Sequence, residues 1–348
     1  MINSSIIKLI SCAVAIQITA IASLAHAEET LEEQASEEIL KEDKTYYATL
    51  TVENDLFGAG TDQNYTNGIR LSWFELGEKP PAITKDLEHI WPFLDINDTT
   101  SVSYSLGHNL YTPNAVGSAT QDPNDRPWAA FLYGSMGMTT LAENHIDEYE
   151  ITLGIIGPAA LGKPIQKTVH DIIDSTDPKG WDNQLKNEPG LMLSWQRRWP
   201  EAWRANIKPL FMSFTPHAGI TAGNIYTYAN AGGTIKISPK ERRWADKPLS
   251  VRPSIPGTGY FPSSDSLGWE IFIGTEGRAI ARNIFLDGNT FSNSHSVDKK
   301  HLVMDANAGV AFTFGQTRLS YTLVYRTKEF DGQDDEDLFG AISVGYNF

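Results

Sequence analysis

The sequence ends in Leu338-Phe-Gly-Ala-Ile-Ser-Val-Gly-Tyr-Asn-Phe348, and this stretch decides the fold. Counting back from Phe348, every second residue is apolar or aromatic, whereas the residues between them are small or polar. This period-two pattern predicts a strand with one apolar face. Such a terminal strand promotes aggregation in a soluble protein, but in a transmembrane β-barrel its apolar face meets lipid. The stretch therefore favours a membrane barrel over the final strand of a soluble sandwich.

The same alternation recurs along the chain. Charged residues such as Arg70, Glu150 and Asp305 fall on the polar face of their segments, which the interior of a barrel tolerates. We predict twelve strands, at about 44–54, 65–74, 100–111, 127–138, 146–156, 190–198, 208–220, 225–238, 267–279, 300–314, 317–327 and 338–348. The fold class is then all-β, with residues 44–348 forming one twelve-stranded antiparallel transmembrane barrel.

The first 27 residues have the features of a secretory signal peptide. Lys8 precedes an apolar stretch that closes on Ala25-His26-Ala27, so we expect cleavage after Ala27. Cleavage would remove Cys12, the one cysteine of the sequence. Residues 28–43 carry eight acidic residues against one lysine, which predicts a solvated periplasmic lead-in.

Composition narrows the class of protein further. The net charge is −15, and no basic stripe or phosphate-binding glycine motif is apparent, so we expect no nucleic-acid partner. No segment after the signal approaches the ~20 consecutive apolar residues of a transmembrane helix. An exported chain with a barrel-like pattern belongs in the outer membrane of a Gram-negative cell.

With an even number of strands, both chain ends lie in the periplasm, and the connections between strands alternate between the cell exterior and the periplasm. The predicted exterior connections are 55–65, 112–127, 157–190, 221–225, 280–299 and 328–337. The predicted periplasmic connections are 75–99, 139–145, 199–207, 239–266 and 315–316. Two of the latter, 75–99 and 239–266, are longer than periplasmic turns usually are.

The exterior connection 157–190 contains a predicted helix at 164–173. Its apolar residues recur at helical spacing, namely Ile165, Val169 and Ile172. Gln166 and His170 are four residues apart, so they project side by side on a neighbouring face. We expect the helix to cover the barrel mouth with its apolar stripe packed inward, which would aim Gln166 and His170 at the rim or lumen. The alternative for His170 is a histidine that only satisfies packing.

A second polar cluster lies at the exterior ends of the first two predicted strands. Asn54 and Asp55 end the first, and Thr66 opens the second on the lumen parity of Gly68 and Arg70. These are also common turn residues, so a polar hairpin tip is the alternative. Together with Gln166 and His170, however, they would bring a carboxylate, amides, a hydroxyl and an imidazole to one level of the barrel. Such a set suits a hydrolytic site.

The motifs in this order resemble a known family. They are Glu53-Asn54-Asp55, Tyr65-Thr66-Asn67-Gly68, Tyr111-Thr112-Pro113, Arg126-Pro127, Gly157-Pro158, Gln166-x-x-x-His170 and Trp181-Asp182-Asn183-Gln184. This pattern, which covers nearly the whole mature chain, is similar to the lipid A 3′-O-deacylase (LpxR-type) family. The resemblance implies a twelve-stranded outer-membrane barrel that hydrolyses the 3′-linked acyloxyacyl ester of lipid A. It also implies a divalent cation, calcium by preference.

Carried over by residue, the resemblance implies Asn54, Thr66, Gln166 and His170 as catalytic groups, with His170 as general base, and Asp55 as a metal ligand. Histidine can exchange a proton near neutral pH, and calcium prefers oxygen ligands. The family also has a lysine after the Tyr-x-Pro motif, and this chain has none between Tyr111 and Arg126. Arg126 or Lys163 would then take over substrate binding.

Two other functions remain open from the sequence. An outer-membrane phospholipase would act on glycerophospholipid esters with similar groups. A catalytically inactive structural barrel or narrow pore would have the rim without the activity. The expected partners are the lipopolysaccharide substrate and outer-membrane lipid, and we expect a monomer.

Overall fold

The computed structural model describes residues 46–58, 64–76, 96–240 and 256–348, together with Thr30, Leu31, Glu33, Pro80 and Val251. The predicted signal peptide at 1–27 lies outside the described residues, as does nearly all of the acidic lead-in at 28–43.

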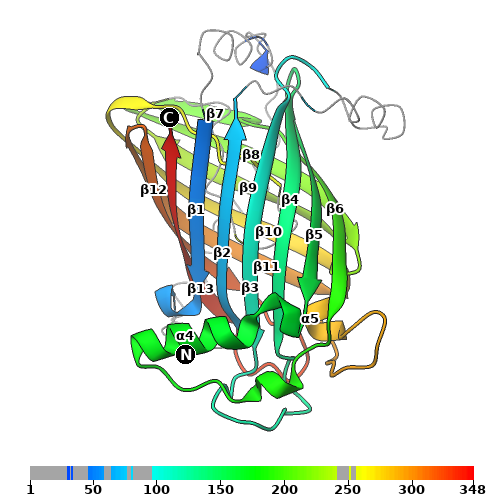
Figure 1. Ribbon diagram of the computed structural model, residues 1–348. Coiled ribbons are helices and arrows are strands. Elements are labelled where there is room, and N and C mark those ends of the chain that lie inside the picture. Colours follow the sequence, from blue (N-terminus) through cyan, green and yellow to red (C-terminus); the bar gives the residue numbers. More distant parts are fainter. Residues whose placement is uncertain are drawn as a thin grey trace.

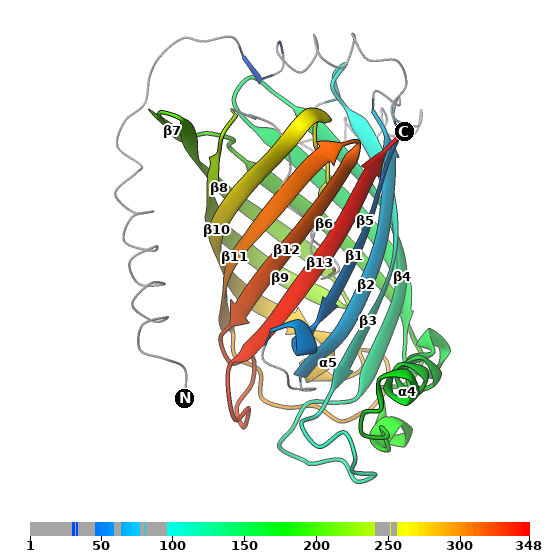
Figure 2. The ribbon, with the colours of Figure 1, turned by 90° about the vertical axis from the view of Figure 1, so that its left-hand side faces the viewer.

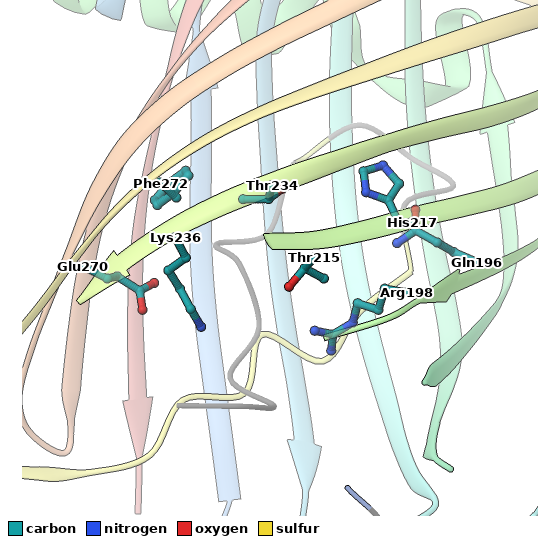
Figure 3. Close-up of a pocket in the computed structure, with 8 residues that line it drawn as sticks. All are labelled: Gln196, Arg198, Thr215, His217, Thr234, Lys236, Glu270 and Phe272. Atoms are coloured by element: carbon teal, nitrogen blue, oxygen red, sulfur yellow. The ribbon is translucent and has the colours of Figure 1, made fainter. Parts of the chain in front are cut away.

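Twelve strands close into an antiparallel barrel, which confirms the predicted fold class (Figures 1 and 2). They are β1 (Tyr46–Asn54), β2 (Asn64–Glu75), β3 (Ser101–Thr112), β4 (Ala129–Leu141), β5 (Ile146–Ile156), β6 (Glu188–Arg198), β8 (Leu210–Gly223), β9 (Tyr226–Ser238), β10 (Ser264–Asn283), β11 (Leu302–Gly315), β12 (Thr317–Arg326) and β13 (Asp337–Asn347). Neighbours in sequence pair with one another, β6 pairs with β8, and β13 returns to pair with β1.

A thirteenth strand, β7 (Trp203–Ile207), occupies the connection predicted as the turn 199–207, so that part of the prediction was wrong. The pairing of β6 with β8 runs from Gly223 back to His217, and the first residues of β8 extend beyond it. β7 pairs with this overhang, from Leu210 to Phe214. The extra strand thus supplies hydrogen-bond partners that the overhang would otherwise take from water.

The alternation of the terminal strand is the predicted one. In β13, Ser343 and Gly345 are buried inside the barrel, whereas Ile342, Val344 and Tyr346 are exposed on its outer wall. The Ser343 hydroxyl lies 3.0 Å from that of Thr51 on β1, which links the two strands across the closure of the barrel. The apolar outer face and polar inner face together are the pattern of an outer-membrane barrel.

Ion pairs fill much of the described lumen. Arg70 on β2 contacts Glu150 on β5 at 2.6 Å, and Arg318 on β12 pairs with Glu270 on β10. Asp305 on β11 accepts hydrogen bonds from Arg278 at 2.7 Å and from Arg326 at 2.9 Å. Because these charges have opposite partners within the wall, they are neutralised locally.

Aromatic residues pack across the lumen at the end where β1 finishes. The rings of Tyr111 and Phe285 stack with centroids 3.8 Å apart, and Phe131 and Tyr226 join the same cluster. Phe285 comes from a short helix, α5 (Ile284–Asp287), in the connection predicted at 280–299. This end of the lumen is therefore packed with side chains.

The long connection predicted as periplasmic at 239–266 reaches into the lumen. The backbone amide of its residue Val251 donates to Glu53 Oε1 at 2.9 Å, and its carbonyl accepts from the hydroxyl of Tyr133 at 2.9 Å. Glu53 and Tyr133 both face inward from the barrel wall. Val251 of that connection thus lies inside the barrel, whereas 241–250, 252–255 and most of 75–99 lie outside the described residues.

The five described helical segments that lie between strands gather at one end of the barrel, opposite the C-terminus (Figure 1). They are η2 (Asp55–Phe57), η3 (Pro158–Ala160), α4 (Gly162–Ile173), η4 (Gly180–Asn183) and α5. This end carries the connections predicted to face the exterior. Among the described residues, no helix is long and apolar enough to cross a membrane.

Candidate active site

The predicted helix exists, but its orientation was predicted wrongly. α4 lies against the outer wall of the barrel rather than over its mouth (Figures 1 and 2). Its buried residues are Gly162, Gln166 and His170, and the apolar residues Ile165, Val169 and Ile172 are exposed. The outer wall is already apolar and faces lipid, so the apolar stripe needs no protein core for burial. The polar residues instead find their partners between the helix and the connection that follows it.

A glycine and a tryptophan fix the start of α4. A Cβ at Gly162 would lie 2.4 Å from the ring of Trp181 and 2.6 Å from the Cβ of Ala130 on β4. Trp181 belongs to η4 and packs with Trp128 and Ala160 in a fully buried cluster on the outer side of the wall. Only glycine permits this close approach, so the beginning of the helix is held tightly against β4.

Trp181 also fixes the side-chain amide of Gln166. The indole N–H of Trp181 donates to Gln166 Oε1 at 2.7 Å. An indole nitrogen is only a donor, so the amide atom facing it must be the oxygen. The amide nitrogen, Nε2, therefore points the other way, where it is buried and has no hydrogen-bond partner in the structure. Gln166 is only 1% exposed, so its Nε2 is a buried hydrogen-bond donor that a ligand could satisfy.

The backbone carbonyl of Thr176 fixes the ring of His170. His170 Nδ1 lies 2.5 Å from that carbonyl oxygen. A carbonyl only accepts hydrogen bonds, so Nδ1 carries the proton and Nε2 is the ring nitrogen with the basic lone pair. His170 is the last buried residue of α4, which ends at Ile173, and the chain then turns so that the Ser175 amide donates to the carbonyl of His170. The turn thus selects the tautomer that a general base needs.

Asn54 and Asp55 lie at the same end of the barrel as α4 (Figure 1). Asn54 ends β1, and its Oδ1 accepts a hydrogen bond from the Leu56 amide at 2.7 Å, so it caps η2. Asn54 is on the outward parity of β1, whereas Glu53 faces the lumen. Asp55 follows in η2 and is 3% exposed. Asn54 is therefore on the outer side of the wall, which is also the side of α4, and Asp55 is buried in the turn that follows it.

Thr66 sits at a break in the pairing of β2 and β3. Tyr65 pairs with Tyr111 and Asn67 pairs with Leu110, so Thr66 is the extra residue of a β-bulge. The side chain of Thr66 lies outside what the structure describes, so its predicted position on the lumen face stays a prediction.

Arg126 and Lys163 are placed very differently. Arg126 is 0% exposed, contacts Glu329 at 3.0 Å and lies over the rings of Tyr111 and Phe330 on the lumen side of the wall. Burial alone would raise the pKa of Glu329, but Arg326 and Arg126 together hold that pKa below its usual value.

Lys163 is exposed on α4 and pairs with Asp182 at 2.8 Å. Of the two basic groups, Lys163 is the one on the same side of the wall as Gln166 and His170.

Sequence reasoning did not assign roles to three groups at this site. Trp181 is the first residue of the motif Trp181-Asp182-Asn183-Gln184. Its hydrogen bond to Gln166 joins residues 15 positions apart and depends on the fold. The Thr176 carbonyl is a backbone atom with no sequence signal. His108 on β3 donates from Nε2 to the Ala160 carbonyl at 2.7 Å and so anchors η3 to the wall.

Comparisons with known proteins agree with this architecture. A family model described as "Outer membrane protein LpxR" matches residues 9–348. Among solved structures, LpxR from Salmonella typhimurium is 20% identical, with a TM-score of 0.68 over 86% of this chain and 99% of that chain. The β-domain of the Bordetella autotransporter BrkA is 7% identical, with a TM-score of 0.44 over 88% of this chain and 100% of that chain. Among curated proteins none matches the sequence.

Proposed function

The chain belongs to the LpxR family of outer-membrane proteins, and from this premise we propose that it is a lipid A deacylase. Its substrate is the 3′-linked acyloxyacyl ester of lipid A, and all the proposed groups come from one chain, which acts as a monomer. The observation that carries the proposal is the buried, unpartnered amide nitrogen of Gln166, four residues from a histidine in its basic tautomer. A buried donor beside a base is what ester hydrolysis requires.

The reaction follows from these two side chains. A water molecule gives a proton to His170 Nε2 as its oxygen attacks the ester carbonyl carbon, and the carbonyl electron pair moves onto the carbonyl oxygen. Gln166 Nε2 donates a hydrogen bond to this developing oxyanion, and Asn54 or Thr66 is a candidate for a second donor. The oxyanion then re-forms the carbonyl, and the bond between the acyl carbon and the sugar oxygen breaks. The protonated imidazole gives its proton to the leaving sugar alkoxide, which yields a 3-acyloxyacyl acid and a free sugar hydroxyl.

Calcium is part of the proposal, with Asp55 as its protein ligand. The Asp55 carboxylate and the Asn54 amide carry oxygen atoms of the kind that a hard cation prefers. Among the described residues there is no group of three histidine, cysteine or acidic side chains that would form a complete metal cage. Water and the phosphates of the substrate would supply the remaining ligands. When bound, the cation would contribute positive charge beside the developing oxyanion.

The alternatives are distinguished by their products. The purified protein is incubated with a mixture of lipid A and glycerophospholipids, and the released acids are identified by mass spectrometry. A lipid A deacylase releases 3-acyloxyacyl acids, whereas a phospholipase releases simple fatty acids. A passive pore would release neither and would conduct ions in planar bilayers. The described lumen argues against an open pore, because ion pairs and an aromatic cluster occupy it.

Replacing Trp181 with phenylalanine is expected to lower kcat by about 10- to 100-fold with little change in KM. The variant keeps an aromatic ring but loses the N–H that fixes the Gln166 amide, so the oxyanion donor loses its alignment. Steady-state kinetics on purified lipid A measures the separate effects on kcat and KM. Trp128→Phe is the matched control, since Trp128 packs against Trp181 in the same cluster, whereas the hydrogen bond to the Gln166 amide comes from Trp181. Equal effects of the two substitutions would reduce the role of Trp181 to packing.

Removing divalent cations with a chelator is expected to stop hydrolysis, and calcium is expected to restore it better than magnesium. Flexible carboxylate and amide oxygens suit calcium more than the rigid octahedral geometry of magnesium. The Asp55→Asn variant should need more calcium for half-maximal activity, and titration of activity against calcium measures this shift. Full activity after exhaustive chelation would remove the cation from the proposal.

A further inference from the structure

The surface of α4 divides into three flanks. One flank, Gly162, Gln166 and His170, is buried against the barrel and η4. A second flank is apolar and exposed, and comprises Leu161, Ile165, Val169, Ile172 and Ile173. The third flank is charged and comprises Lys163, Lys167 and Asp171, with side chains 53–62% exposed. With ~100° of rotation per residue, the apolar and charged flanks lie on opposite sides of the buried one.

The direction of the helix fixes which way each flank points. α4 begins beside β5 and runs along the outer wall towards β1, and the exterior connections lie below it in Figure 1. In a right-handed helix that runs this way with its buried flank on the wall, the apolar flank faces the body of the barrel. The charged flank faces the exterior connections.

The charged flank behaves as a solvated surface. Lys167 forms ion pairs with Asp171 at 3.3 Å and with Asp177 at 3.4 Å. The hydrogen bond to Asp171 and the charges of both carboxylates raise the pKa of Lys167, so it stays positively charged. Exposed pairs of this kind are stable in water or among lipid headgroups, but not among acyl chains.

The apolar flank faces an outer wall that is itself apolar. The outer wall exposes large apolar side chains on β2, β3 and β4, namely Ile69, Leu71, Leu106 and Leu132. Ile172 is 77% exposed, which is more than any of these four. An amphipathic helix with this division of its faces lies in the interface plane of a membrane.

We propose that α4 is an interfacial helix whose apolar flank inserts among the acyl chains of the outer leaflet, next to the lipid headgroups. The occupant of this surface is thus lipid rather than a second protein chain, because the apolar flank faces the apolar outer wall of the barrel and the charged flank lies on the side of the exterior connections. The buried flank that carries Gln166 and His170 would then lie next to the leaflet, between the wall and the inserted apolar flank. A lipid ester would reach these groups without leaving the membrane.

Cysteine labelling tests the proposal without reference to catalysis. In a Cys12→Ser background, Ile172→Cys and its neighbour Asp171→Cys are each labelled with a small fluorophore and reconstituted into phosphatidylcholine vesicles with brominated acyl chains. The two sites are adjacent in sequence and both exposed, but they lie on opposite flanks. Fluorescence at Ile172 is expected to be quenched at least about twofold more strongly than at Asp171.

Two controls make the result decisive. Heat-modifiable gel migration verifies that both labelled variants are folded barrels. A water-soluble quencher, iodide, should show the opposite order, with Asp171 the more accessible site. Equal quenching of the two labels by brominated lipid, or stronger quenching at Asp171, would overturn the proposal. Either result leaves the deacylase proposal untouched, since no substrate is hydrolysed in this experiment.

Discussion

Replacing His170 with alanine is expected to abolish ester hydrolysis, with a loss of about 10²- to 10⁴-fold, while the barrel stays folded. The imidazole is the group placed to accept the proton of water, since the Thr176 carbonyl holds its Nδ1 in the protonated form. Initial rates on purified lipid A measure the loss, and heat-modifiable migration reports folding.

A matched control for this substitution is His145→Ala. His145 lies in the connection between β4 and β5, at the opposite end of the barrel from α4, and pairs with Asp147 at 3.3 Å. We expect it to keep full activity. If the folded His170→Ala variant also keeps full activity, His170 is not the base and the site must lie elsewhere.

The second large effect is expected on stability rather than activity. Asp305 accepts hydrogen bonds from both Arg278 and Arg326 within the lumen, and it is buried. Replacing it with alanine leaves two guanidinium groups without this carboxylate. Removing one partner of a buried charge pair costs about 3–5 kcal/mol of the free energy of unfolding. Urea titration of the barrel in lipid vesicles, followed by tryptophan fluorescence, measures this quantity.

Asp331→Ala is the control for that experiment. Asp331 also pairs with a basic residue, Lys300, but both side chains are exposed. An exposed pair contributes about 0–1 kcal/mol, so the control should unfold at nearly the concentration of urea that the parent protein needs. If Asp305→Ala is no less stable than Asp331→Ala, the ion pairs of the lumen do not stabilise the barrel.

The barrel could be predicted because its signal is local. In the terminal strand, every second residue from Ile342 onward must face lipid, and this constraint is visible in the order of residues alone. The extra strand β7 was missed because it pairs with the overhang of β8 and is not part of the ring. Its presence depends on how far β8 extends past β6, which the alternation of β8 itself does not reveal.

The site was only partly predictable, for a physical reason that concerns α4. The spacing of Ile165, Val169 and Ile172 identifies an apolar flank, but such a flank is satisfied equally by a protein core and by lipid. We predicted that the flank packs inward against the protein, but it is exposed in the structure. The pairing of Gln166 with Trp181 depends on the fold of the intervening turn, and the bulge at Thr66 depends on the partner strand.

The central claim is that this chain removes an acyl group from lipid A in the outer membrane. The most direct measurement is a mass spectrum of lipid A from Gram-negative cells that express the protein, compared with cells that express the His170→Ala variant. The account predicts a lipid A species that lacks the mass of the 3′-linked acyloxyacyl group with the parent protein and not with the variant. Identical spectra from the two strains, with both proteins folded in the outer membrane, would contradict it.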